Sequence, residues 1–162
     1  MTRGLGVCCD ALLREQPPFP VSPGAQSRYL DVDPVPASVG LARGFVADVL
    51  SPLDHDTREV ALLLTSELVT NAILHARTPV QVGVLLDNEQ VLICVGDRME
   101  ASAELVPSGH SRTRPGGRGL ALVADLSSTW GTQSYVGGKT VWFVLTALDA
   151  SGQEPNRSVR VG

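Results

Sequence analysis

Glu67 and Asn71 are the residues whose types and spacing first suggest chemistry. They lie in the segment ELVTNAILH, residues 67–75, where most other side chains are aliphatic. Residues four apart share one face of a helix, and this helix is expected to be buried nearly all round. A buried carboxylate without a partner costs several kcal/mol. Two explanations are open: either the pair lies at a partly solvated helix end, or Glu67 is a base beside an amide that binds a hard cation.

Asp97 and two glycine-rich segments extend this set of polar positions. Asp97 ends the apolar segment VLICVGD, where an acid can accept a hydrogen bond from a ligand amine, although an ordinary turn residue has the same appearance. The segment GGRG, residues 116–119, precedes a helical pattern. Glycines there let backbone N–H groups approach an anion, although a flexible loop end has a similar composition. A second segment, GGKT at residues 137–140, begins the last strand pattern.

Two common nucleotide-binding motifs are absent from the sequence around these glycines. A P-loop requires a glycine five residues before GKT and a helix after it, but Gln133 holds that position and a strand pattern follows. The dinucleotide fingerprint G-x-G-x-x-G must follow a strand. After Gly117 and Gly119 its last position holds Leu122, and a loop precedes it. The glycines therefore require a different interpretation.

Hydrophobic periodicity predicts the elements that position these residues. A loop is expected at residues 98–116, where no strong period is present. The order of the elements indicates the α+β class, as a two-layer sandwich with a mixed, mostly antiparallel sheet and helices on one face. The predicted helices are residues 36–50, 56–76 and 117–126, and the predicted strands are residues 27–33, 80–86, 91–97, 128–136 and 139–148.

Length and composition set the limits of the protein class. The chain has 162 residues, which corresponds to one domain. We expect a disordered N-terminal tail at 1–26, an ordered domain at 27–148 and a disordered C-terminal tail at 149–162. The net charge of -4 argues against direct nucleic-acid binding, and no apolar run reaches the ~18 residues of a membrane span. Three cysteines without a disulfide or zinc spacing predict reduced thiols in the cytoplasm.

The motifs in their order along the chain resemble the histidine-kinase-type ATPase superfamily. They are ELVTNAILHA, the acid at a strand end, GGRGLALVADLSSTWG and GGKTVWFVL. The superfamily includes gyrase B, heat-shock chaperone ATPases and sensor histidine kinases. Within it the sequence is most similar to bacterial anti-sigma-factor serine/threonine kinases of the small, stand-alone actinobacterial type. The resemblance covers residues 28–147.

This resemblance implies an ATP site with Mg²⁺ and a role for each matched residue. Glu67 matches the general base, and Asn71 matches the magnesium ligand. Asp97 matches the acid that accepts from the adenine amino group, and Thr140 matches a last-strand hydroxyl near adenine. One departure is Met99, at a position where the family often has glycine.

The resemblance also assigns the phosphate-binding residues and a lid. Gly117 and Gly119 match the glycines that contact the phosphates, and residues 98–116 match the lid over the nucleotide. A lid cation would help to neutralise the phosphate charge. The candidates for it are Arg112, Arg114 and Arg118.

The implied function is that of an anti-sigma factor and protein kinase. Such a protein binds a sigma factor and is released when it phosphorylates or binds an anti-anti-sigma protein. The alternative is a non-catalytic binding module that uses ATP, or only its fold, to hold a regulatory partner. The resemblance further implies a homodimer, and a strand at 27–33 on a sheet edge would suit pairing. Asp31 and Asp33 in that strand would instead discourage it.

Overall fold

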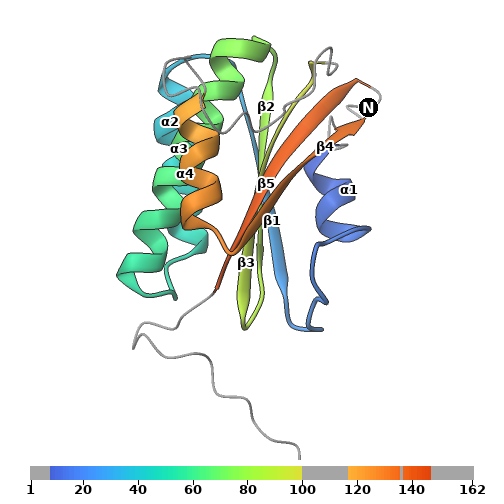
Figure 1. The fold of residues 1–162 in the computed structure, drawn as a ribbon, viewed down its shortest axis with the longest axis vertical. Helices are drawn as coiled ribbons and strands as arrows, with labels where there is room; N and C mark the ends of the chain where they lie inside the picture. The colour runs from blue at the N-terminus through green and yellow to red at the C-terminus, as the bar shows by residue number, and fades with distance from the viewer. Residues whose placement is uncertain (1–7, 100–116, 136, 147–162) are drawn as a thin grey trace, which may run out of the picture.

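The computed structural model describes residues 8–99, 117–135 and 137–146. Three helices cover one face of a five-stranded sheet, and a short fourth helix lies on the other face (Figure 1). The α+β class and the predicted fold are confirmed. The helices are α1 (Cys8–Arg14), α2 (Ala37–Val49), α3 (His55–Ala76) and α4 (Gly117–Leu126), and the strands are β1 (Gln26–Val32), β2 (Val80–Leu86), β3 (Gln90–Asp97), β4 (Thr129–Tyr135) and β5 (Gly138–Thr146).

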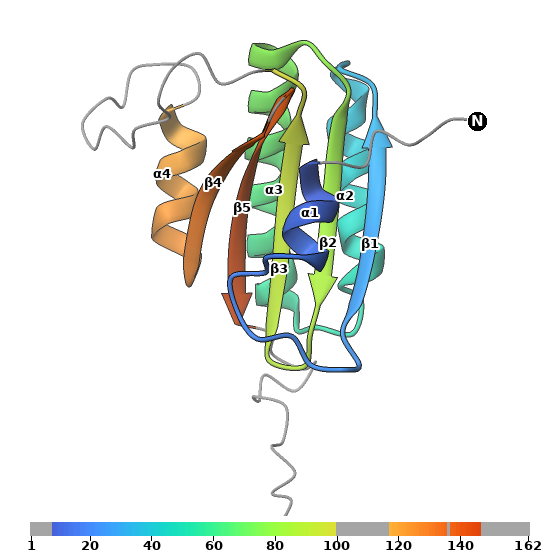
Figure 2. The same cartoon turned by 90° about the vertical axis from the view of Figure 1, so that its right-hand side faces the viewer.

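The sheet has the strand order β1-β2-β3-β5-β4, and every neighbouring pair is antiparallel (Figure 2). The strands β2 and β3 are almost entirely buried, because helices cover both of their faces. This explains why their sequences are nearly continuous apolar runs rather than alternating ones. At the end of the β3–β5 pair, Asp97 lies opposite Lys139.

The helix α3 lies over the middle of the sheet and carries the first pair of candidate residues. It begins after Asp54, whose Oδ1 accepts a hydrogen bond of 2.9 Å from the Thr57 N–H. It ends at Arg77, which adopts a left-handed conformation with φ 53°. Such a cap at each end is typical of a well-defined helix. The expectation of burial nearly all round is wrong, since Leu63 and Leu74 are exposed.

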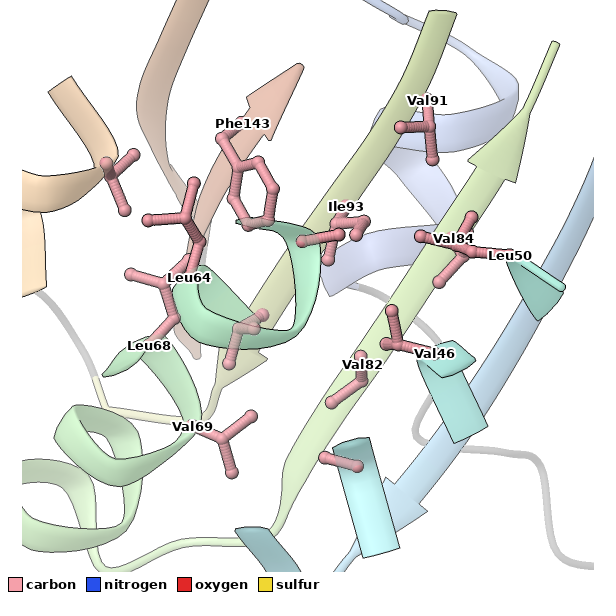
Figure 3. Close-up of a cluster of buried hydrophobic side chains, with 14 of the residues drawn as sticks. Val46, Leu50, Leu64, Leu68, Val69, Val82, Val84, Val91, Ile93 and Phe143 are labelled. Atoms are coloured by element: carbon pink, nitrogen blue, oxygen red, sulfur yellow. The ribbon is translucent and has the colours of Figure 1, made fainter. Parts of the chain in front are cut away.

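The main core lies between the sheet and the helices α2 and α3. Leu64 of α3 points toward Phe143 of β5, while Val46 of α2 lies near Val82 and Val84 of β2 (Figure 3). All five side chains are fully buried. Of the helices in the described residues, none has both the length and the apolar composition that a membrane-spanning helix requires.

The helix α1 corrects the prediction of a disordered tail over residues 1–26, because residues 8–14 are helical. Cys9, Leu12 and Leu13 lie on one side of α1 and are buried against the second face of the sheet. Their spacing of three and four residues forms an apolar stripe. Burial, followed by the neighbouring Cys94 thiol, raises the pKa of the Cys9 thiol. Both of these described cysteines are free thiols.

The structure bears to different extents on the predictions of the two tails and of the dimer. Residues 1–7 and 147–162 lie outside the described residues, so the C-terminal tail stays a prediction. The strand β1 does lie at a sheet edge, as expected. The homodimer stays a prediction that light scattering with and without ATP would test.

We predict that Leu12→Ala lowers the free energy of unfolding by about 2–5 kcal/mol, because truncating a buried leucine removes apolar contacts and leaves a cavity. Leu12 is 3% exposed, whereas Leu41 on α2 is 63% exposed and provides a matched control. Leu41→Ala should change the stability by less than about 0.5 kcal/mol. Urea unfolding of both variants measures the difference, and equal small effects would mean that α1 does not pack on the sheet.

Candidate functional site

The first turn of α4 lies directly against Glu67 and Asn71 of α3. A Cβ atom built on Gly119 would lie 2.7 Å from Asn71 Nδ2 and 3.5 Å from Glu67 Oε2. Real Cβ atoms do not approach other atoms to 2.7 Å, so this position requires a glycine unless the amide moves. The structure therefore brings together three of the residues predicted from the sequence.

The Glu67 and Asn71 side chains are half-buried and make no hydrogen bond or ion pair with any residue that the structure describes. A carboxylate in this position is partly hydrated, which reduces its desolvation cost. The first explanation from the sequence, a partly solvated pair, is thus correct about exposure. It does not explain why a glycine in a second helix is packed against both side chains. A carboxylate and an amide with unused acceptor oxygens are suited to bind a proton and a hard cation.

Four chain segments meet at this end of the sheet. The C-terminal half of α3, the N-terminus of α4, the end of β3 and the start of β5 all lie at the upper end in both views (Figures 1 and 2). The N-terminus of α4 presents backbone N–H groups that no earlier helical turn can pair. Such N–H groups, together with the helix dipole, favour an anion.

Asp97 ends β3 and is 4% exposed. Its Oδ1 accepts a hydrogen bond of 2.9 Å from the Met99 N–H, and its Oδ2 lies 3.8 Å from Lys139 Nζ. Burial raises the pKa of Asp97, while the Met99 N–H and the Lys139 ammonium act in the opposite direction. The turn role left open by the sequence is therefore real. The carboxylate also has a cationic neighbour, which the sequence analysis did not include in the site.

Thr140 is not brought together with the other predicted residues, and its assignment is corrected here. Side chains alternate between the two faces of a strand. Trp142, two residues after Thr140, packs on the α1 face of the sheet, whereas Phe143 packs on the α3 face. Thr140 shares the face of Trp142. Its cross-strand neighbour Gln133 donates from Nε2 to Gln16 Oε1 at 3.3 Å, on the same α1 side.

Lys139 instead lies on the face of β5 that α3 covers, beside Asp97. Counting back by twos from Phe143, which packs on the α3 side, leads to Lys139, not to Thr140. The sequence alone does not indicate this, because residues 141–145, VWFVL, are apolar on both faces. A shift of one residue along a strand moves a side chain to the opposite face. The Thr140 hydroxyl is buried without a hydrogen-bond partner among the described residues.

The remaining predicted residues are only partly described. Gly117 begins α4, as expected. The Arg118 side chain lies outside the described part, as do Arg112, Arg114 and nearly all of the predicted lid. Which arginine serves as a cation therefore stays a prediction.

The residues present fit a magnesium nucleotide better than a metal held by protein ligands alone. In the described parts of the chain, no group of three or more His, Cys, Asp or Glu side chains is placed to hold a metal ion. Mg²⁺ is usually bound through one or two protein oxygens together with substrate phosphates. The Asn71 amide oxygen and the anion-favouring start of α4 provide this combination.

Two solved structures are similar to this chain. The crystal structure of the RsbU and RsbW domains of Rv1364c from Mycobacterium tuberculosis has a TM-score of 0.59 and 19% identity, covering 77% of this chain and 34% of that chain. The chain thus spans about a third of that structure. The histidine kinase domain of a blue-light-activated histidine kinase from Erythrobacter litoralis EL346 has a TM-score of 0.43 and 20% identity, covering 73% of this chain and 62% of that chain.

The sequence comparison gives the family directly. No curated protein sequence matches the chain. Residues 32–145 match the family described as the histidine kinase-like ATPase domain. This range holds both members of the α3 pair, the Asp97–Lys139 pair and the first turn of α4. The chain belongs to the histidine kinase-like ATPase domain family.

Proposed function

We propose that the protein binds ATP with Mg²⁺ at the end of the sheet where α3 and α4 meet, and that it is a protein serine/threonine kinase. The observation that carries this proposal is the packing of Gly119, in the first turn of α4, against Glu67 and Asn71. It brings a candidate base, a candidate cation ligand and an anion-favouring helix start together within a few ångströms. Membership of an ATPase family supports the nucleotide.

In this proposal the residues have separate roles in phosphoryl transfer. The start of α4 and Asn71 orient the phosphates, and Asp97 accepts a hydrogen bond from the adenine amino group. The hydroxyl oxygen of the partner forms a bond to the γ-phosphorus while the bond between that phosphorus and the β–γ bridging oxygen breaks. Glu67 accepts the hydroxyl proton. Mg²⁺, when bound, neutralises charge on the phosphates.

We further propose that the partners are a sigma factor and an anti-anti-sigma protein. The motifs of the sequence support this, and the similarity in fold to a structure that contains an RsbW domain is compatible with it. The second candidate is a non-catalytic module that holds a partner with or without ATP. It is favoured by Met99, which stands where the family often has glycine, and by the existing contacts of the Asp97 carboxylate.

Removing the Asp97 carboxylate should weaken ATP binding. Losing a hydrogen bond to a charged group in a buried position corresponds to about a 10- to 100-fold loss of affinity. Calorimetry with MgATP on Asp97→Ala measures this loss. The exposed Asp125 of α4 provides the matched control, since Asp125→Ala should bind ATP as the wild type does. An Asp97→Ala variant that folds and keeps its affinity would show that adenine binds elsewhere.

Glu67→Ala should separate binding from chemistry. A base acts in the transition state, and its loss typically lowers the rate ~10²–10⁴-fold, while ATP affinity should stay close to that of the wild type. The rate is measured as transfer of labelled phosphate from ATP to the proposed anti-anti-sigma partner. Glu59, exposed on the same helix, is the control for a lost glutamate. A wild type that binds ATP but transfers no phosphate would favour the non-catalytic module, and transfer at the wild-type rate by Glu67→Ala would exclude this residue as the base.

Gly119→Ala should damage the site while sparing the fold. The added Cβ meets the end of the flexible Asn71 side chain at 2.7 Å, so the amide is displaced at low cost to stability. We expect MgATP affinity to fall at least about tenfold and the dependence of binding on Mg²⁺ to weaken. Gly44→Ala on α2 is the control, because nothing lies within 4 Å of its Cβ. It should gain up to about 1 kcal/mol of stability with unchanged ATP affinity. Equal ATP affinities in the two variants would show that Gly119 does not lie at the nucleotide site.

A further inference from the structure

Lys139 is the only lysine of the chain, whose other basic residues are twelve arginines. It lies at the start of β5, opposite Asp97, with Nζ 3.8 Å from Oδ2. The side chains are 19% and 4% exposed, so water is largely removed from the pair. Ion pairs of this kind add little to stability once the desolvation of both charges is counted. Stability alone therefore does not explain the pair as a whole, although Lys139 offsets the charge of the buried Asp97 carboxylate.

The pair presents a hydrogen-bond acceptor beside a donor. A carboxylate offers about four lone pairs on two oxygens, and the Met99 N–H is one of the donors to Asp97. A lysine ammonium has three N–H donors and no acceptor. Its compact charge fits beside Asp97, where the planar fork of an arginine would favour a bidentate contact with the carboxylate itself. At 3.8 Å, the two groups are in ionic contact but too far apart for a good hydrogen bond.

Adenine has the complementary edge, since its exocyclic amino donor is adjacent to the ring acceptor N1. We propose that Lys139 is a specificity-determining residue of the ATP site, donating a hydrogen bond to adenine N1 while Asp97 accepts one from the amino group. This inference rests on the proposed function and assigns to it a residue that the sequence motifs did not indicate.

The same pair would disfavour guanine in this orientation. Guanine carries a carbonyl where adenine has the amino group and an N–H where adenine has N1. The carbonyl would then face the Asp97 carboxylate, and the N–H would face the Lys139 ammonium. A site that leaves buried polar groups unpaired rejects the wrong ligand strongly. ATP should therefore bind in preference to GTP.

The experiment compares MgATP with 1-deaza-ATP, in which N1 is replaced by C–H, on the wild type and on Lys139→Met. The wild type should bind 1-deaza-ATP roughly tenfold or more weakly than ATP, as expected for a lost hydrogen bond to a charged group. Lys139→Met should bind ATP more weakly by a similar factor and should not distinguish the two nucleotides. Lys139→Gln, which keeps an N–H donor, should recover part of the discrimination. Circular dichroism checks that each variant is folded.

A second measurement uses the wild type alone and does not depend on any variant. Because the chain has one lysine, selective ¹³C-lysine labelling gives a single Lys139 Cε resonance. ATP should shift it more than 1-deaza-ATP does at saturation. The proposal is wrong if Lys139→Met binds ATP as tightly as the wild type, or if it still distinguishes the nucleotides by the wild-type factor. A wild type that binds neither nucleotide would instead overturn the proposed ATP site as a whole.

Discussion

The close approach of α4 to α3 at Gly119 is the constraint on which the rest of the site depends. With no side chain at this position, the first turn of α4 can lie against the Asn71 amide and the Glu67 carboxylate at once. Any larger residue would move the amide or the helix. The approach places the helix start, whose first N–H groups have no partner in an earlier turn, beside a carboxylate and an amide that have no partners among the described residues. Three groups of different chemistry thus share one small region, although they are far apart in the sequence.

The alternation of side chains in the antiparallel sheet decides which residues can join this region. Both faces of the sheet are covered, by α2, α3 and α4 on one side and by α1 on the other (Figure 2). Asp97 and Lys139 face the first side, where a nucleotide would lie between them and α4. Thr140 and Trp142 face the second side. The buried central strands thus hold the acid and the lysine at the same level of the sheet.

Much of the fold could be predicted because the elements are long and strongly periodic, and their order sufficed for the fold class. The α3 pair could be found because two polar side chains four residues apart stand out in an aliphatic helix. The helix α1 was missed because it has seven residues and is followed by a proline-rich stretch that resembles a tail. Lys139 was not predicted, because a motif gives a residue type, whereas the face of a strand depends on a register of one residue. The packing at Gly119 depends on how two helices meet, which no local pattern records.

The central claim is that one nucleotide with its metal ion occupies the region between α3, the start of α4 and the Asp97–Lys139 pair. A crystal structure with a non-hydrolysable ATP analogue and Mn²⁺ in place of Mg²⁺ tests it most directly, because the anomalous signal of manganese locates the ion independently of the nucleotide density. The account predicts a peak about 2.0–2.2 Å from Asn71 Oδ1, as octahedral Mg²⁺-type coordination requires, with adenine against Asp97 and Lys139. A nucleotide bound at another place, or a metal peak remote from Asn71, would contradict it.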